Sequence, residues 1–197
     1  MSTYFFRPLV LVAAAVAGVA CGSDSITSAD LDAALAPLTS SAIEAGPFSD
    51  VLPDAPITTA VDARNRALTI FPGATIEDVD LDDVERELTV AEVRLLPAGG
   101  GGEVKLHFSL DNGRLAEAEG ESAPFGYSFA PGGFASLADA IAAATGISGK
   151  AGTVTQWKLQ FEDGARWQYR VWVTAADGDW RVRVNAVTAS VSRVQER

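Results

Sequence analysis

The chain has few of the residues on which most catalytic and metal centres depend. Its 197 residues include one cysteine, one histidine and one methionine. A single cysteine cannot build an internal disulfide framework or a thiolate zinc cage. A single histidine has no second imidazole to join it in a metal centre, and we expect no Cys partner with which it would form a nucleophile. We therefore expect no catalytic residues, no metal site and no cofactor, and a protein that is not an enzyme.

Basic residues are also scarce. The chain has 15 Lys and Arg against 26 Asp and Glu, a formal net charge of −11. Binding to nucleic acid needs positive charge that meets phosphates, so we expect no nucleic-acid partner. The charge is uneven, because residues 21–129 hold six basic and twenty acidic residues whereas residues 130–197 hold eight and six. The two parts therefore present different electrostatic surfaces.

The main long hydrophobic run lies near the N-terminus. Residues 9–17, LVLVAAAVA, are too few to span a bilayer and are typical of the central region of a signal peptide. Residues 18–21, GVAC, follow and resemble a bacterial lipoprotein signal, in which Cys21 is lipidated and becomes the first mature residue. Gly18 departs from that pattern, since a leucine is usual there. The alternative is an ordinary secretory signal cleaved near Ala20, with Cys21 incidental.

The lipoprotein resemblance implies a body tethered outside the cytoplasmic membrane by the acyl chains, palmitate among them, on Cys21. Residue 22 is not the aspartate that retains lipoproteins in the inner membrane. The implied location is therefore the outer membrane, facing the periplasm, if the cell has two membranes, and otherwise the outer face of the cytoplasmic membrane. We expect a signal peptide over 1–20 and a tether over 21–57, rich in Ser, Ala, Asp and Pro. The alternative for the tether is a short helix over 30–38 that packs on the body.

Strand patterns are clearest near the C-terminus, where period-two alternation is broken by Asp163-Gly164 and Asp177-Gly178. All four tryptophans lie in this stretch. The predicted strands cover 153–162, 165–175, 179–187 and 189–194.

The same spacing of apolar residues recurs earlier in the chain, at an offset of 76 to 78 residues. Helices are expected from a Thr59 cap to Ile70 and from a Ser136 cap to Thr145. The earlier strands are expected over 75–83, 87–96, 103–110 and 114–118.

These patterns predict an α+β fold of two tandem repeats. Each repeat would be one helix packed on a three- or four-stranded antiparallel meander. The repeats are expected over 58–120 and 135–197, with a connection over 121–134.

The later strands divide their side chains between two faces. Trp157, Trp167 and Trp180 are expected in the core under the helix. The opposite face is basic and contains one tryptophan. Its arginines either bind a partner, since Trp and Arg dominate binding hot spots, or simply cover the sheet or dock on the acidic part. The candidate binding residues are Arg166, Arg170, Trp172, Arg181 and Arg183.

Two further features of the earlier part bear on metal binding. Asp78, Asp80 and Asp82 line one outward face of a predicted strand, which predicts either a solvated acidic surface or, alternatively, a weak cation site. His107 points outward between Lys105 and Ser109 in its strand, so we expect a plain surface histidine.

Short motifs in both parts resemble the PepSY and PepSY-like domain family. Residues 184–191, VNAVTASV, match that family's V-D-A-x-T-G-x-V with Asn185 and Ala189 in place of Asp and Gly. Residues 71–74, FPGA, and 108–115, FSLDNGRL, resemble its helix end and its terminal strand-turn-strand. The resemblance implies a non-enzymatic extracytoplasmic module that recognises a protein or peptide and inhibits or regulates an envelope peptidase. The alternative is a structural envelope lipoprotein with no dedicated ligand.

Overall fold

The computed structural model describes residues 46–197 apart from 86–87, 122–128, 150 and 163–165. Cys21, the expected signal peptide and most of the expected tether lie outside the described residues. Among the described residues, no helix is both long and apolar enough to cross a membrane.

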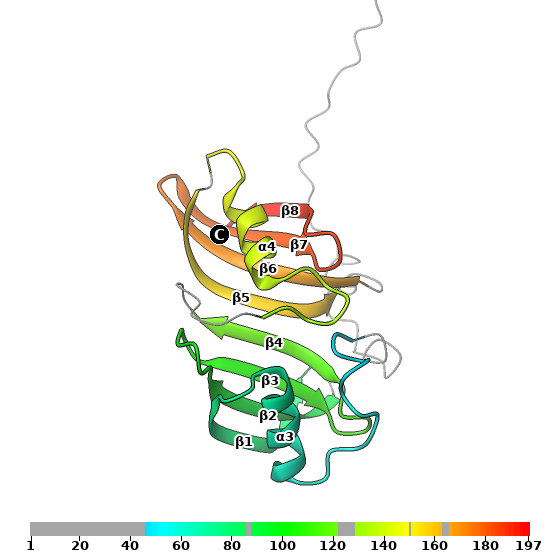
Figure 1. Ribbon diagram of the computed structural model, residues 1–197. Coiled ribbons are helices and arrows are strands. Elements are labelled where there is room, and N and C mark those ends of the chain that lie inside the picture. Colours follow the sequence, from blue (N-terminus) through cyan, green and yellow to red (C-terminus); the bar gives the residue numbers. More distant parts are fainter. Residues whose placement is uncertain (1–45, 86–87, 122–128, 150, 163–165) are drawn as a thin grey trace, which may run out of the picture.

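In the described part of the chain, eight strands form one antiparallel sheet in chain order (Figure 1). Each strand pairs with the next along the chain, so every connection is a hairpin or a longer return that leaves neighbours in sequence adjacent in the sheet. The strands are β1 (Thr75–Glu85), β2 (Leu88–Leu96), β3 (Val104–Ser109), β4 (Leu115–Glu121), β5 (Gly152–Glu162), β6 (Arg166–Ala175), β7 (Gly178–Asn185) and β8 (Val191–Glu196).

The prediction of two tandem α+β repeats, each with its own meander, is wrong. The described part of the chain is mostly β and forms one sheet, because β4 pairs with β5 from Glu117 opposite Gln160 to Glu121 opposite Gln156. An edge strand presents unpaired N–H and C=O groups, and joining β4 to β5 satisfies both edges at once. The period-two pattern reports which side chains share a face, and it is the same whether two sheets stay apart or join.

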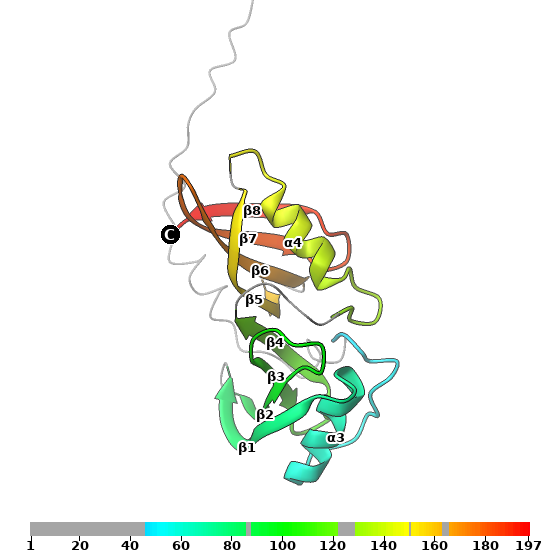
Figure 2. The same ribbon diagram turned by 60° about the vertical axis from the view of Figure 1, so that its left-hand side comes forward.

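Two short helices lie on the same face of this sheet, α3 (Ala60–Ile70) and α4 (Leu137–Thr145) (Figures 1 and 2). Thr59 and Ser136 cap them as predicted, each accepting a hydrogen bond from the backbone N–H three residues later. In α3 the carboxylate of Asp62 also accepts from the Thr59 N–H, which completes a capping box. The caps satisfy amides that an isolated helix end would leave unpaired.

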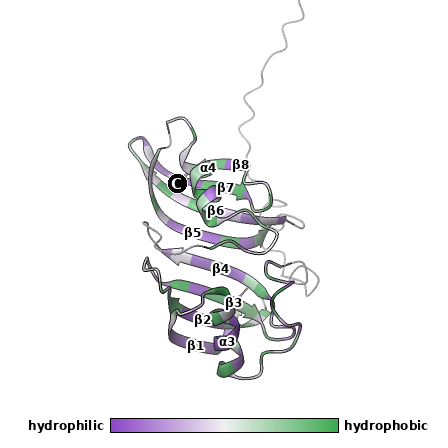
Figure 3. Cartoon of the chain, viewed as in Figure 1, coloured by the Kyte–Doolittle hydropathy of each residue, from purple (hydrophilic) through white to green (hydrophobic). Residues whose placement is uncertain are grey.

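The core lies between the helices and the sheet, and it is one continuous cluster of buried side chains. Hydrophilic and hydrophobic residues alternate along strands such as β4 and β5 (Figure 3). Trp157 and Trp167 are buried in this core as predicted, at 0% and 6% exposure. Trp180 is only half-buried, so its predicted place in the core is wrong. It lies two residues from the start of β7, beside the hairpin turn, and its indole N–H donates to Asp177.

The chain before α3 also packs on the body. Leu52 and Ile57 are buried, and the Ile57 N–H donates to the Leu110 carbonyl at 2.8 Å. Phe129 lies in the segment that connects β4 to α4, and the centroid of its ring is 6.0 Å from that of Phe48. The described portion of the expected tether therefore belongs to the folded body.

Candidate functional site: the open face of the sheet

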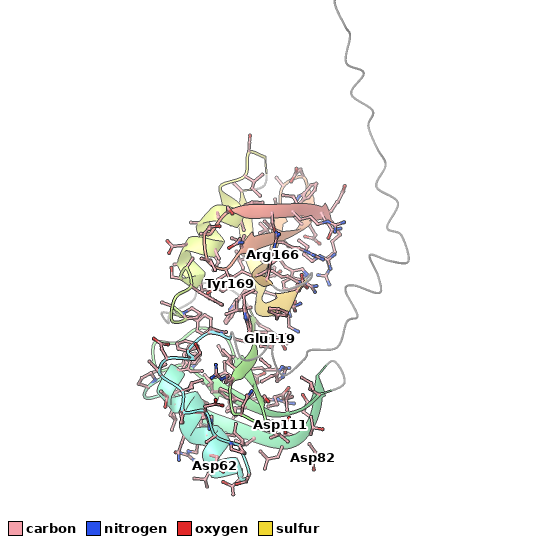
Figure 4. All side chains as sticks on the ribbon, turned by 90° about the vertical axis from the view of Figure 1, so that its right-hand side faces the viewer. Asp62, Asp82, Asp111, Glu119, Arg166 and Tyr169 are labelled. Carbon is pink, nitrogen blue, oxygen red and sulfur yellow. The ribbon has the colours of Figure 1, made fainter. Side chains whose placement is uncertain are left out.

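The sheet face opposite α3 and α4 carries polar side chains in rows that cross the strands. Among the described residues, neither helix nor the segment before α3 lies over it, and we call it the open face. Figure 4 views the sheet edge-on, with the helices on one side and nitrogen-bearing side chains over β6–β8 on the other. Because β4 and β5 are paired, each row runs without interruption through both parts of the chain.

Three such rows follow directly from the strand register. The first row contains Glu92, His107, Glu117, Gln160, Gln168 and Asn185. The second contains Arg94, Lys105, Glu119, Lys158, Arg170, Arg183 and Arg193. The third contains Glu121, Gln156, Trp172, Arg181 and Gln195.

The first row, apart from half-buried Asn185, is buried although it lies on the open face. His107 is 4% exposed and Glu117 is 1% exposed. The prediction of a surface histidine is therefore wrong. Alternation along β3 correctly indicates that His107 points away from the helices. It does not show that carboxylates on β2 and β4 flank the imidazole on both sides.

His107 sits between two carboxylates. Its Nε2 lies 2.9 Å from Glu92 Oε2, and its Nδ1 lies 3.4 Å from Glu117 Oε1. Burial by itself would lower the pKa of His107, but Glu117 and Glu92 outweigh it and raise the pKa to about 9.

The same contacts keep both carboxylates charged. Burial opposes the charge on Glu117, yet His107 and Lys158 hold the pKa of its carboxyl below the ordinary value. The Lys158 ammonium lies 2.5 Å from Glu117 and 3.3 Å from Glu119, so it ties β5 to β4 by charge as well as by backbone pairing. Buried charges in proteins are paired in this way because an isolated one is costly.

The other end of the open face is basic. Glu162 forms ion pairs with Arg170 and, at 3.2 Å, with Arg183. Arg181 donates to Gln195 at 2.6 Å. Burial, and then the charges of Arg183, Arg193 and Arg197, lower the pKa of Arg181. Like charges are therefore concentrated over β7 and β8; we call Arg181, Arg183, Arg193 and Arg197 the arginine cluster.

The predicted binding residues are only partly brought together. Trp172 and Arg181 are direct partners across β6 and β7, and Arg170 pairs with Arg183 one row away. Arg166 lies apart, exposed at the start of β6 opposite Glu162. Arg170 and Arg183 already share Glu162, so part of this charge serves the sheet itself.

A shallow hollow adjoins the arginine cluster at the β6–β7 hairpin. Its lining includes two partly exposed indoles and the C-terminal arginine. It is lined by Thr155, Trp172, Val173, Thr174, Asp179, Trp180 and Arg197.

Sequence reasoning missed the acidic partners that organise both ends of the face. The alternation along each strand predicts only ordinary outward-facing side chains for Glu92, Glu117 and Glu162. Only the register across strands, which places Glu92 and Glu117 opposite His107, reveals them as buried partners. Asp78, Asp80 and Asp82 are all exposed, as predicted for an acidic surface.

Comparisons with known proteins leave the family open. No protein-family model matches the chain, so its PepSY resemblance stays a prediction from short motifs. No curated protein matches it either. One solved structure, from Clostridium difficile 630 and described as a candidate lipoprotein, has a TM-score of 0.33 and 15% identity. That match covers 77% of this chain and 99% of the other.

Proposed function

We propose that this chain is a lipid-anchored envelope protein that binds an acidic segment of another protein on the basic end of its open face. The anchor rests on the signal-like residues 9–17 and on Cys21 directly after residues 18–20. The proposed role is binding, without catalysis.

The arginine cluster is the observation that carries the binding proposal. Three of its arginines lie on the neighbouring strands β7 and β8, and Arg197 directly follows β8. Burial and mutual repulsion already disfavour the charge on Arg181. A carboxylate-bearing ligand would relieve that repulsion, and arginine binds carboxylates through paired hydrogen bonds. The adjoining hollow offers Trp172 and Trp180 as apolar contacts beside the charges.

Photo-crosslinking in cells tests the proposal. A benzophenone amino acid replaces Trp172 in the chain with its own leader, so that the protein reaches its natural location. We expect a discrete adduct whose crosslinked segment is rich in Asp and Glu. The double substitution Arg181→Glu and Arg193→Glu should abolish the adduct, because it reverses the charge that the ligand meets.

The matched control is Arg64→Glu, which reverses an exposed charge on α3, on the covered side of the sheet. The adduct should survive this change. If no adduct forms, or if the double reversal leaves the adduct intact, the binding proposal is wrong. That result would favour the alternative of a structural envelope lipoprotein with no dedicated ligand. An adduct between two copies of this chain would also count against it.

The envelope peptidase suggested by the sequence resemblance is the first partner to assay. The mature chain should lower peptidase activity in envelope fractions, and the Arg181→Glu and Arg193→Glu chain should not. Intact-mass measurement tests the anchor separately, since an unmodified Cys21 at the mature N-terminus would contradict it and leave the binding face untouched.

A further inference from the structure

The acidic end of the open face brings together three side chains with metal-binding atoms. His107 Nε2 lies 2.9 Å from Glu92 Oε2 and 3.8 Å from Asp83 Oδ2. These three atoms all lie within 4.8 Å of one another. The donors come from three different strands, β1, β2 and β3, so the sheet fixes their relative positions.

A β-bulge in β1 places Asp83 in this group. Asp80 pairs with Glu92, but Asp83 pairs with Val90, so β1 has one residue more than β2 between the two pairs. Such an insertion moves the following side chain to the other face of the sheet. Without the bulge Asp83 would point to the opposite side from Asp80, whereas with it Asp83 shares the face of Glu92 and His107.

We propose that Asp83, Glu92 and His107 bind a divalent transition-metal ion, with Zn²⁺ the best match to one imidazole nitrogen and two carboxylate oxygens. Zinc bonds to these atoms are about 2.0–2.2 Å long, so two ligands of a tetrahedral ion lie roughly 3.3 Å apart. The observed separations of 2.9 and 3.8 Å lie on either side of that value. Three protein ligands leave a fourth position for water or a partner's group.

The neighbouring residues orient these ligands as outer partners do in metal sites. The other oxygen of Glu92 accepts from Arg94 at 2.6 Å, which leaves Oε2 to face His107. Glu117 lies behind the imidazole at 3.4 Å from Nδ1, and Nδ1 has no hydrogen-bond partner among the described residues. An ion between Nε2 and Glu92 would widen their 2.9 Å separation and push the ring toward Glu117, where Nδ1 could then donate.

The sequence-based expectation of no metal site rested on the single histidine and the single cysteine, and the carboxylates weighed as a cation site were Asp78, Asp80 and Asp82. Asp83 and Glu92 come together with His107 through the pairing of the strands. The side chain of Asp83 is 38% exposed and those of Glu92 and His107 are 11% and 6% exposed, so the site opens to solvent at Asp83.

Zinc titration of the mature chain tests the proposal. Cys21→Ser removes the only thiol, and the protein is purified without a polyhistidine tag, so that His107 is its only imidazole. After chelator treatment we expect one Zn²⁺ per chain by calorimetry, a rise in melting temperature, and a shift of the single set of imidazole NMR signals. Glu117→Gln should weaken binding about 10–100-fold, as outer-partner changes do.

His107→Gln and Asp83→Asn should each weaken binding by more than Glu117→Gln does, because each removes a ligand. Asp83 is half-exposed near the end of β1, so Asp83→Asn provides a test even if His107→Gln fails to fold. The matched control is Asp82→Asn, which removes the same charge from the adjacent, exposed residue and should bind like the parent chain. Equal zinc binding by Asp83→Asn and Asp82→Asn, no zinc binding by the parent chain, or a response to Ca²⁺ alone would each overturn the proposal.

Discussion

At the scale of single residues, Tyr169 shows how burial and charge act on one group. Its hydroxyl donates at 2.9 Å to the carbonyl of Ala135, the residue before the Ser136 cap of α4. Burial, and then the negative charge of Asp139, raise the pKa of Tyr169 above the ordinary value of 10.0. The folded protein therefore holds this proton where the unfolded chain releases it.

This shift predicts a pH dependence of stability. A raised pKa in the folded state contributes stability that is complete below about pH 10 and is lost as pH rises above it, by roughly 1.4 kcal/mol per pH unit. Tyr169→Phe should cost about 1 kcal/mol at pH 8 through the lost hydrogen bond. Urea unfolding at pH 8 to 11 should show the gap between parent and variant closing as pH rises. A constant gap would contradict the shift.

A second residue, Ala189, adopts a backbone conformation that favours glycine. Its φ is +53°, in the turn between β7 and β8 where Asn185 accepts from the N–H groups of Val187 and Thr188. The left-handed region costs a residue with a Cβ about 1–2 kcal/mol. Position 189 is also where the resembled motif has its Gly.

We therefore expect Ala189→Gly to stabilise the protein, by about 0.5–1 kcal/mol after the entropy cost of glycine in the unfolded chain. Thermal and urea unfolding measure the change. Ala143→Gly, on α4, is the control that should destabilise by about 1 kcal/mol. A loss of stability on Ala189→Gly would show that the contacts of the Ala189 methyl outweigh the strain.

At the scale of elements, the segment before α3 is held by one buried guanidinium. Arg66 on α3 donates to the carbonyls of Pro53 and Ala55, each at 2.6 Å, and to that of Gly113 at 3.0 Å. A Cβ on Gly113 would lie 2.2 Å from the Arg66 guanidinium carbon. Glycine is therefore required there for space as well as for its φ of +67°.

Arg66→Met should destabilise the protein by roughly 2–4 kcal/mol, because it leaves buried carbonyls without donors. Arg64→Met, two residues earlier on the exposed side of α3, should change stability by less than about 0.5 kcal/mol. A chain begun at Pro56 should lose at least as much as Arg66→Met, since it also removes buried Leu52. Urea unfolding measures all three, and a stable chain begun at Pro56 would show that the segment is a tether after all.

At the scale of the whole molecule, one sheet and one core join the two parts of the chain. The ring of Phe129 stacks on Phe71, at the end of α3, with 5.6 Å between ring centroids. It also lies 5.2 Å from Trp157 on β5. Phe129 and the β4–β5 pairing therefore connect the core under α3 with the core under α4.

We expect a single cooperative unfolding transition as a result. All four tryptophans lie in the later part, so their fluorescence reports that part, whereas far-UV circular dichroism reports the whole sheet. The two curves should coincide in the parent chain and separate in Phe129→Ala. Phe134→Ala removes a ring that contacts Trp167 within the later part and should lower stability without separating them. Two transitions in the parent chain would contradict one cooperative unit.

Much of the local structure could be predicted from the sequence. Short-range patterns account for the helix caps at Thr59 and Ser136, the strands on either side of the two Asp-Gly pairs, and the burial of Trp157 and Trp167. Such patterns depend on a few neighbouring residues, and period two is a property of one strand. The candidate lipidation site at Cys21 has the same local character.

The tertiary structure alone decided what depends on partners distant in the sequence. Pairing of β4 with β5 merged the expected repeats into one sheet and aligned rows of charge across both parts. The bulge in β1 turned Asp83 toward His107, and the register of β2 and β4 enclosed that histidine between Glu92 and Glu117. Register and bulges are set by packing and backbone hydrogen bonds between strands, and the alternation within one strand carries no record of them.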